Sequence, residues 1–281
     1  MFRKGSYFIV LLLLPLLFLF TAAVLKNKTL PADHPKIWKK TDLWEVVKLH
    51  QKGKAEELFE FFQENSAVID EREPYYGQSL LIWSARNGYY DFCELLLENG
   101  ADPNIQANDG TTALIHAAGL SHAALVRLLL RKGADPNAVA EIKPIDSYQP
   151  MRTALIVASS NSLEHVKLLV DSGADIDYTF TQFRMQNALV SAMRARKIDI
   201  ARYFIIDQKI NLDNIIHLNH KKDTVDVRTY LRDLAFELES EEYQIKMEVV
   251  NHLLRNRIDY WAAPVPRNMY HNFSADYLKR Y

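Results

Sequence analysis

Apolar residues along the chain fall into short runs that recur at a regular spacing. Three runs of helical periodicity are each followed by a segment that begins Gly-Ala-Asp; these segments are Gly100–Asn104, Gly133–Asn137 and Gly173–Asp177. The first two of them start 33 residues apart. A shorter apolar motif precedes each run, in the copies Gly77–Leu81, Gly110–Leu114, Thr153–Leu155 and Asn187–Leu189. The pattern predicts units of two short helices, a glycine stop and a turn.

The glycines and their neighbours predict the turns. A glycine directly after a helix is typical of a C-terminal cap, because the capping residue often adopts a left-handed backbone conformation that Gly reaches without steric cost. Asn108-Asp109-Gly110 then predicts a tight, hairpin-like tip that leads into the next unit.

Between Gly110 and Asn137 the residues resemble the ankyrin repeat family, whose pattern is G-x-T-P-L-H-x-A-A followed by V-x-x-L-L-x-x-G-A-D-x-N. The sequence departs from that pattern at two positions: the family's Pro is Leu80, Ala113, Ala154 and Ala188 here, and its His is Ile82, Ile115, Ile156 and Val190. We therefore expect apolar packing to contribute more to stacking than a polar network does. The resemblance implies an all-α ankyrin-repeat solenoid of about six helix pairs with short hairpin-like turns.

The repeat domain is expected to run from 42 to 259. Its units are a divergent N-terminal cap at 43–75, then 76–108, 109–149, 150–185 and 186–222, and a C-terminal cap at 223–259 in which Arg257 replaces the glycine. Terminal units of such arrays need one face on a neighbour and one in water. The unit at 109–149 has eight extra residues in its turn, which predicts a long finger at about Val139 to Met151.

The N-terminus predicts a membrane segment. Tyr7–Leu25 contains no charged residue over 19 positions, which corresponds to a helix about 28 Å long, close to the thickness of a bilayer's hydrocarbon core. We expect a basic leader at 1–6, a transmembrane signal anchor at 7–25 and a linker at 26–41. Cleavage as a signal peptide is the alternative, and would leave a secreted or periplasmic protein. We expect the repeats to lie outside the cytoplasm, although the lysines after the span favour a cytoplasmic orientation. Asn27 and Asn272 begin glycosylation tripeptides whose use the sequence leaves open.

Composition and motifs exclude several function classes. A net charge of −1 gives no basic stripe for nucleic acid, and a single cysteine, Cys93, excludes an intramolecular disulfide. No phosphate loop or zinc-protease motif occurs. We interpret His217 and His220 as exposed, and Glu71 and Glu73 as part of a solvated loop. The sequence therefore predicts no catalytic residue, no metal site, no cofactor and no small-molecule substrate.

The resemblance implies binding of a protein partner through turn tips and first helices. Candidate partner-binding residues are aromatic or apolar side chains at tips and at variable first-helix positions, namely Tyr75, Tyr76, Trp83, His116, Leu120, Tyr148, Tyr178, Phe180, Phe183 and Met185. Alternatively, the aromatic fingers pack on each other. We expect a non-catalytic, membrane-tethered scaffold for an unidentified protein; the alternatives are a soluble exported protein with the same binding chemistry and a regulatory subunit of an enzyme supplied in trans. The tail at 260–281 either covers the last repeat or meets a partner or the membrane interface.

Overall fold

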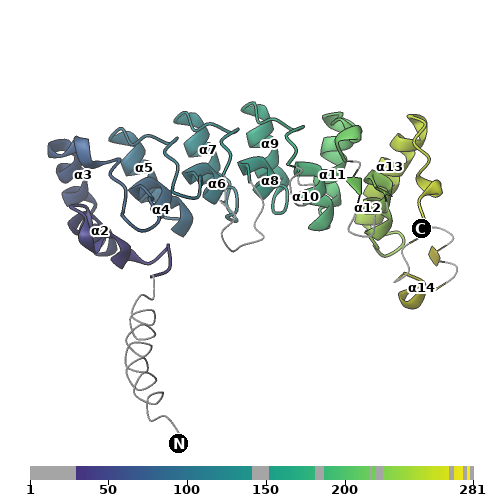
Figure 1. Ribbon diagram of the computed structural model, residues 1–281, viewed down its shortest axis with the longest axis horizontal. Coiled ribbons are helices and arrows are strands. Elements are labelled where there is room, and N and C mark those ends of the chain that lie inside the picture. The colour runs from purple at the N-terminus through teal and green to yellow at the C-terminus, as the bar shows by residue number, and fades with distance from the viewer. Residues whose placement is uncertain are drawn as a thin grey trace, which may run out of the picture.

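The helices form two layers that run the length of a gently curved array, shown in a computed structural model (Figure 1). The structure describes residues 30–140, 152–180, 187–215, 217–218, 224–265, 269–274 and 277–278. The first helix of each pair lies in one layer: α2 (Trp44–Gln51), α4 (Leu80–Asn87), α6 (Ala113–Ala117), α8 (Ala154–Ala158), α10 (Ala188–Arg194) and α12 (Val227–Asp233). The second helices form the other layer: α3 (Ala55–Glu64), α5 (Tyr90–Glu98), α7 (Ala124–Arg131), α9 (Leu163–Asp171), α11 (Ile198–Arg202) and α13 (Glu241–Arg255).

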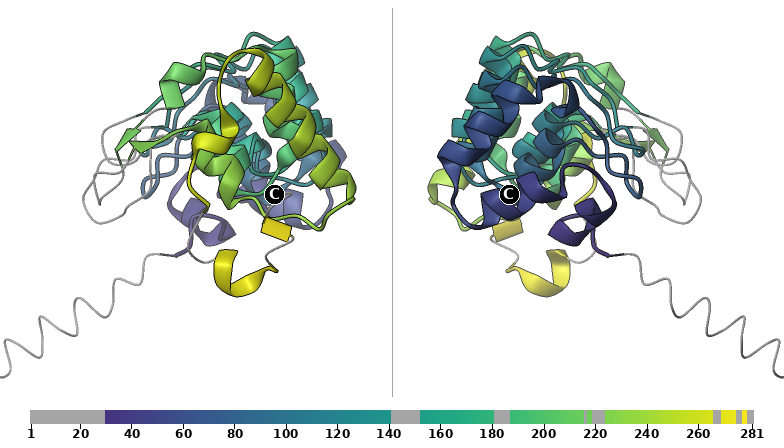
Figure 2. Two further views of the ribbon diagram at one scale, coloured as in Figure 1. Left: turned by 90° about the vertical axis from the view of Figure 1, so that its right-hand side faces the viewer. Right: turned by 90° about the vertical axis from the view of Figure 1, so that its left-hand side faces the viewer.

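The remaining elements are short. They are η1 (Pro35–Lys40), η2 (Ser66–Val68), the π-helix η3 (Tyr203–Asp207), η4 (Leu212–Ile215), η5 (Tyr260–Ala262), α14 (Met269–Asn272), and the antiparallel strands β1 (His217–Leu218) and β2 (Thr224–Val225). Seen along the stack, the turns project to one side of both helix layers (Figure 2). Each helix pair contributes one helix to each layer, and the β1–β2 hairpin is a small addition to an otherwise helical fold.

Local sequence explains where the helices begin and end. The side-chain oxygens of Ser79, Thr112, Thr153 and Asn187 each accept a hydrogen bond from the backbone N–H three residues later, which caps α4, α6, α8 and α10. The N–H of Ala134 donates to Leu129 O at 3.0 Å beside Gly133, whose φ is +87°. This is the glycine cap that the repeated Gly-Ala-Asp segment predicts.

Apolar side chains from both layers form one continuous core. Leu81, Leu114, Leu155 and Leu189 are the corresponding residues of four successive first helices, and each is at most 1% exposed. Cys93 lies in the same core, where burial raises the pKa of its thiol to about 12. No single pair could bury these residues alone, so each unit depends on its neighbour for its hydrophobic stabilisation.

An Asx ladder, made of Asp70, Asn104, Asn137 and Asp177, joins successive units along the turns. Asn104 Oδ1 accepts from the N–H of Asp135 at 2.7 Å, and its Nδ2 donates to Gly133 O at 3.0 Å. Asn137 repeats both bonds to Asp175 and Gly173 in the next unit. At the two ends of the ladder, Asp70 and Asp177 accept from the N–H groups of Asp102 and Asn211. The ladder fixes the register between units, which apolar contact alone leaves free to slide.

Residues 30–40 of the expected linker at 26–41 form a packed element. Ile37 and Trp38 of η1 are fully buried, and the Trp38 ring lies edge-on against Trp83, with ring centroids 6.4 Å apart. Trp83 Nε1 donates to Asp33 O at 3.0 Å, and the Tyr76 hydroxyl donates to Leu30 O. We call residues 30–40 the docked segment. The packing was not evident from the sequence, because one isolated Ile-Trp pair carries no periodicity and still buries a large apolar area.

The tail that follows α13 packs against the end of the array, which is one of the two arrangements expected for 260–281. Tyr260 is fully buried and Met269 is 2% exposed, while the Tyr277 hydroxyl donates to Phe236 O at 2.5 Å. The Arg232 guanidinium lies 4.4 Å from the centroid of the Tyr260 ring. The tail therefore shields apolar surface of α12 and α13 that an open solenoid end would expose.

Non-glycine residues take the left-handed conformation in the last two units. Arg196, Lys209 and Arg257 have φ values of 61°, 53° and 62°. Lys209 and Arg257 occupy the positions that Gly133 and Gly173 hold in the middle units, and Arg196 occupies that of Gly88. A side chain in this conformation costs about 1 kcal/mol relative to glycine.

The Asx ladder predicts a specific stability loss. Asn137→Ala removes two bonds between units, so we expect the free energy of unfolding to fall by about 1 to 2 kcal/mol in urea titrations. Asn161→Ala is the matched control, because Asn161 Nδ2 bonds only to Val157 O within its own unit. Equal losses for the two variants would show that the ladder does not couple the units.

Lys246 predicts a pH dependence of stability. Burial, with the nearby charges of Arg232 and Arg196, lowers its pKa to about 6 from the ordinary 10.5. Between these two values the unfolded chain binds more protons than the folded one, so stability rises with pH, by up to about 1 kcal/mol per unit. Lys246→Met removes both the titrating amine and its 3.1 Å bond from Nζ to Leu234 O. We expect the variant to lose the rise between pH 6.5 and 9 in urea titrations; an unchanged slope would contradict the assignment.

The docked segment predicts a change in protease sensitivity. Trp38→Ala removes a buried indole worth about 3 kcal/mol of packing or more, so tryptic cleavage after Lys39 and Lys40 is expected to accelerate by about 100-fold. Phe59→Ala is the control, because that side chain is 49% exposed. Equal cleavage rates in the two variants would mean that the segment is not held by Trp38.

Candidate functional site

The candidate partner-binding residues separate into three groups in the structure. Trp83, Tyr76 and Tyr75 lie against the docked segment. His116 and Leu120 lie on and just after α6. Tyr178 and Phe180 are half-buried in the turn between α9 and α10. Tyr148, Phe183 and Met185 lie outside the described residues, as do most of the long finger and the whole of Tyr7–Leu25.

Trp83 is not available as a groove residue. It is 1% exposed, and its ring is enclosed by Trp38, His50 and Tyr89. Its place in the repeat pattern predicted exposure, but the docked segment covers that position in the first complete unit. Large aromatic side chains at the end of an array are often capped in this way, because the open end otherwise exposes apolar surface.

Tyr75 and Tyr76 occupy the first turn tip. Tyr75 remains 46% exposed, with Lys40 Nζ 5.8 Å from its ring centroid. Tyr76 is half-buried, and its carbonyl accepts from the N–H of Asn108 in the next tip at 2.8 Å. The first two tips therefore do pack on each other, which leaves Tyr75 as the exposed aromatic side chain of this pair.

Glu73 builds that tip from within. Its carboxylate accepts hydrogen bonds from the N–H groups of Tyr75, Tyr76 and Gln78 at 2.7, 2.8 and 3.0 Å, and the residue is 1% exposed. The interpretation of Glu73 as a solvated loop residue was wrong. A buried carboxylate that accepts three backbone donors is a turn-forming group, and proton transfer chemistry is not needed to explain it.

The middle first helices form a continuous row of small and apolar side chains, which we call the groove floor. It consists of His116, Leu120, Val157, Ser160 and Ser191, which come from α6, α8 and α10 and the residues that directly follow α6 and α8. A Cβ on Gly119 would lie 3.5 Å from Val157 Cγ1, and the hydroxyls of Ser160 and Ser191 are 2.8 Å apart. These distances show that successive first helices touch along the row.

Arginines lie at the two ends of the groove floor. Arg86 is exposed next to His116, and Arg194 is exposed next to Tyr230, to whose hydroxyl it donates at 3.2 Å. Burial, with the charge of Arg86, lowers the pKa of His116 to about 4, so the imidazole is neutral at physiological pH. The floor is thus uncharged, and its flanks are cationic.

Sequence reasoning found part of this surface. His116 and Leu120 were predicted from their variable positions in the repeat. Val157 and Ser191 occupy the same repeat position as His116 and were missed, because neither is aromatic or charged. The alignment of the units was the signal that would have found them.

The described residues contain no group of three or more His, Cys, Asp or Glu side chains placed to hold a metal ion. His165 is fully buried on α9, and His217 begins β1. Among the described residues, no helix is long and apolar enough to cross a membrane.

Comparison with known families agrees with the fold. Residues 43–140 match the model described as ankyrin repeats (3 copies), and residues 151–179 match the model of the ankyrin repeat. No curated protein matches the chain. The pairs α10/α11 and α12/α13 lie outside the matched ranges and continue the same arrangement. The chain therefore carries ankyrin repeats over 43–140 and 151–179.

Proposed function

We propose that this protein is a non-catalytic scaffold that binds a protein partner on the groove floor and the adjoining turn tips, while its N-terminus tethers it to a membrane. Ankyrin repeats are generally protein–protein interaction modules. The observation that carries the proposal is the groove floor itself, a row of uncharged side chains across three units of which His116, Leu120, Val157 and Ser160 are half-buried.

The groove floor suits an extended or helical segment of a partner. Its neutral His116 and half-buried Leu120 and Val157 present apolar area without a buried charge to desolvate. Arg86 and Arg194 at the ends can form charge-assisted hydrogen bonds with carboxylates. We expect a partner segment with an apolar centre and acidic flanks, because that arrangement meets both features at once.

Support for the tether comes from the uncharged stretch Tyr7–Leu25, which is long enough to span a bilayer as a helix. The proposal keeps the repeat domain outside the cytoplasm, with a cleaved and exported form as its alternative. The partner, on this proposal, is found in the compartment that the repeats face.

Site-specific crosslinking tests the binding surface. A photoreactive amino acid at Leu120 is expected to crosslink one protein in intact cells, and the same group at Arg131, exposed at the end of α7 in the other layer, is not. The captured protein is then purified and titrated against Val157→Asp, which places a charge in the floor. We expect affinity to fall by at least about 30-fold, because burying an unpaired carboxylate costs about 2 kcal/mol or more.

The control variant is Lys132→Asp, which introduces the same carboxylate at an exposed site in the second-helix layer. Equal affinities for wild type and Val157→Asp would refute the groove floor as the binding surface. Crosslinking at Arg131 but not at Leu120 would move the site to the opposite layer.

A further inference from the structure

The docked segment limits how far the array can stand from a membrane. Residues 30–40 are fixed to the array through Trp38, Trp83 and Tyr76. Only five peptide units separate Leu25, the end of the apolar stretch, from Leu30. Even a fully extended chain spans no more than about 3.6 Å per residue, or roughly 18 Å here. If 7–25 is embedded, the first turn tip and η1 lie close to the lipid headgroups.

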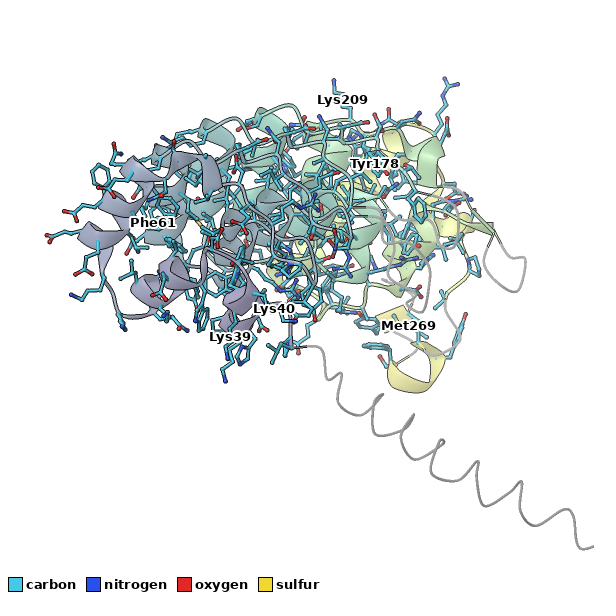
Figure 3. All side chains as sticks on the ribbon, turned by 60° about the vertical axis from the view of Figure 1, so that its left-hand side comes forward. Lys39, Lys40, Phe61, Tyr178, Lys209 and Met269 are labelled. Atoms are coloured by element: carbon cyan, nitrogen blue, oxygen red, sulfur yellow. The ribbon has the colours of Figure 1, made fainter. Side chains whose placement is uncertain are left out.

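The chain next to this point is rich in lysine. Five lysines and two aspartates lie between Lys26 and Asp42. In the described part, Lys36, Lys39 and Lys40 are exposed, as are Asp33 and Asp42. Lys39 and Lys40 lie along one edge of the array, close to the point where the described chain begins (Figure 3). Lysines close to a bilayer are attracted by anionic headgroups.

The opposite end of the array presents an exposed aromatic side chain, Tyr270 of α14. Both η1 and α14 lie on the side of the first helices away from the second-helix layer, and this holds in two perpendicular views (Figures 1 and 2). Met269 is buried and holds α14 in place, whereas Tyr270 is 62% exposed. Exposed Tyr and Trp side chains are enriched where proteins meet the headgroup region.

We propose that the array rests on an anionic phospholipid surface through two contacts, the lysines of the docked segment and the exposed Tyr270 of α14. This inference rests on the proposed tether and adds an orientation to it. The two lipid contacts lie at the ends of the array, the groove floor of α6, α8 and α10 lies between them, and the second-helix layer faces away from the bilayer.

The test uses the full chain reconstituted into vesicles with a nitroxide quencher on the lipid headgroups. The native Cys93 is buried and its pKa is raised, so a dye attaches selectively to an introduced cysteine. Tyr270→Cys reports on the contact near α14. Asp171→Cys, exposed at the end of α9 in the other layer, is the matched control.

In vesicles containing phosphatidylserine, we expect the dye at position 270 to be quenched at least twofold more than the dye at position 171. We expect this difference to shrink in purely zwitterionic vesicles and in the variant Lys36→Gln/Lys39→Gln/Lys40→Gln. Equal quenching at the two positions would refute the orientation. If the difference in quenching is unchanged in zwitterionic vesicles and in the triple lysine variant, the proposed contact with an anionic surface is refuted.

Flotation of the same vesicles in alkaline carbonate separates this inference from the tether. If the chain leaves the vesicles, the proposed membrane tether is refuted, and so is the orientation that depends on it. If the chain floats and the two dyes are quenched equally, the tether stands and the orientation alone is wrong. Trypsin digestion of the triple variant checks that its repeat array is still folded, because Arg72 and other basic sites in the array remain.

Discussion

Contact between successive helix pairs is the interaction on which the rest of the molecule depends. Each pair is two layers thick and only one unit wide, so its leucines can leave water only against a neighbour. Hydrophobic contact supplies most of the free energy but little direction. The Asx ladder supplies direction, because Asn104 and Asn137 each bind a backbone donor and a backbone acceptor of the next unit. Turn tips and groove floor keep their spacing only as long as this register holds.

The sequence predicts the repeated parts of the fold well, since repetition turns weak local signals into a strong one. The glycine caps, the hydroxyl and amide N-caps and the two-helix units all lie where the recurrence places them. The parts it fails to predict occur once. Trp38 has no periodic partners, and nothing near Glu73 signals that its carboxylate would be enclosed by a turn. The role of Asn104 and Asn137 is an intermediate case: the recurrence marked them, but their bonding partners lie one unit away and become evident only when the units are stacked.

The candidate site shows the same division. Variable positions on the first helices identified His116 and Leu120, and the stack adds Val157 and the Ser160–Ser191 pair beside them. Trp83 occupies the same repeat position as His116, but the prediction that it is exposed fails because the docked segment covers it. The ends of the array are thus used for closure by the chain's own residues, and the middle first helices retain the surface that faces outward. A search for aromatic residues alone therefore selects residues at the ends of the array, where the chain covers its own surface, and misses the exposed surface of the middle first helices.

The left-handed arginine and lysine residues have a consequence for how the array folds. All four described non-glycine residues with positive φ lie after residue 195, and the described part of the ladder ends at Asn211. The middle units carry Gly133 and Gly173 at the positions of Arg257 and Lys209, and both asparagines of the ladder, so they form at a lower conformational cost. We expect folding to begin there and to spread toward the C-terminus, and hydrogen exchange to be fastest in α12 and α13. During synthesis the more stable middle units leave the ribosome before the C-terminal units. The C-terminal units can then pack against neighbours that are already folded.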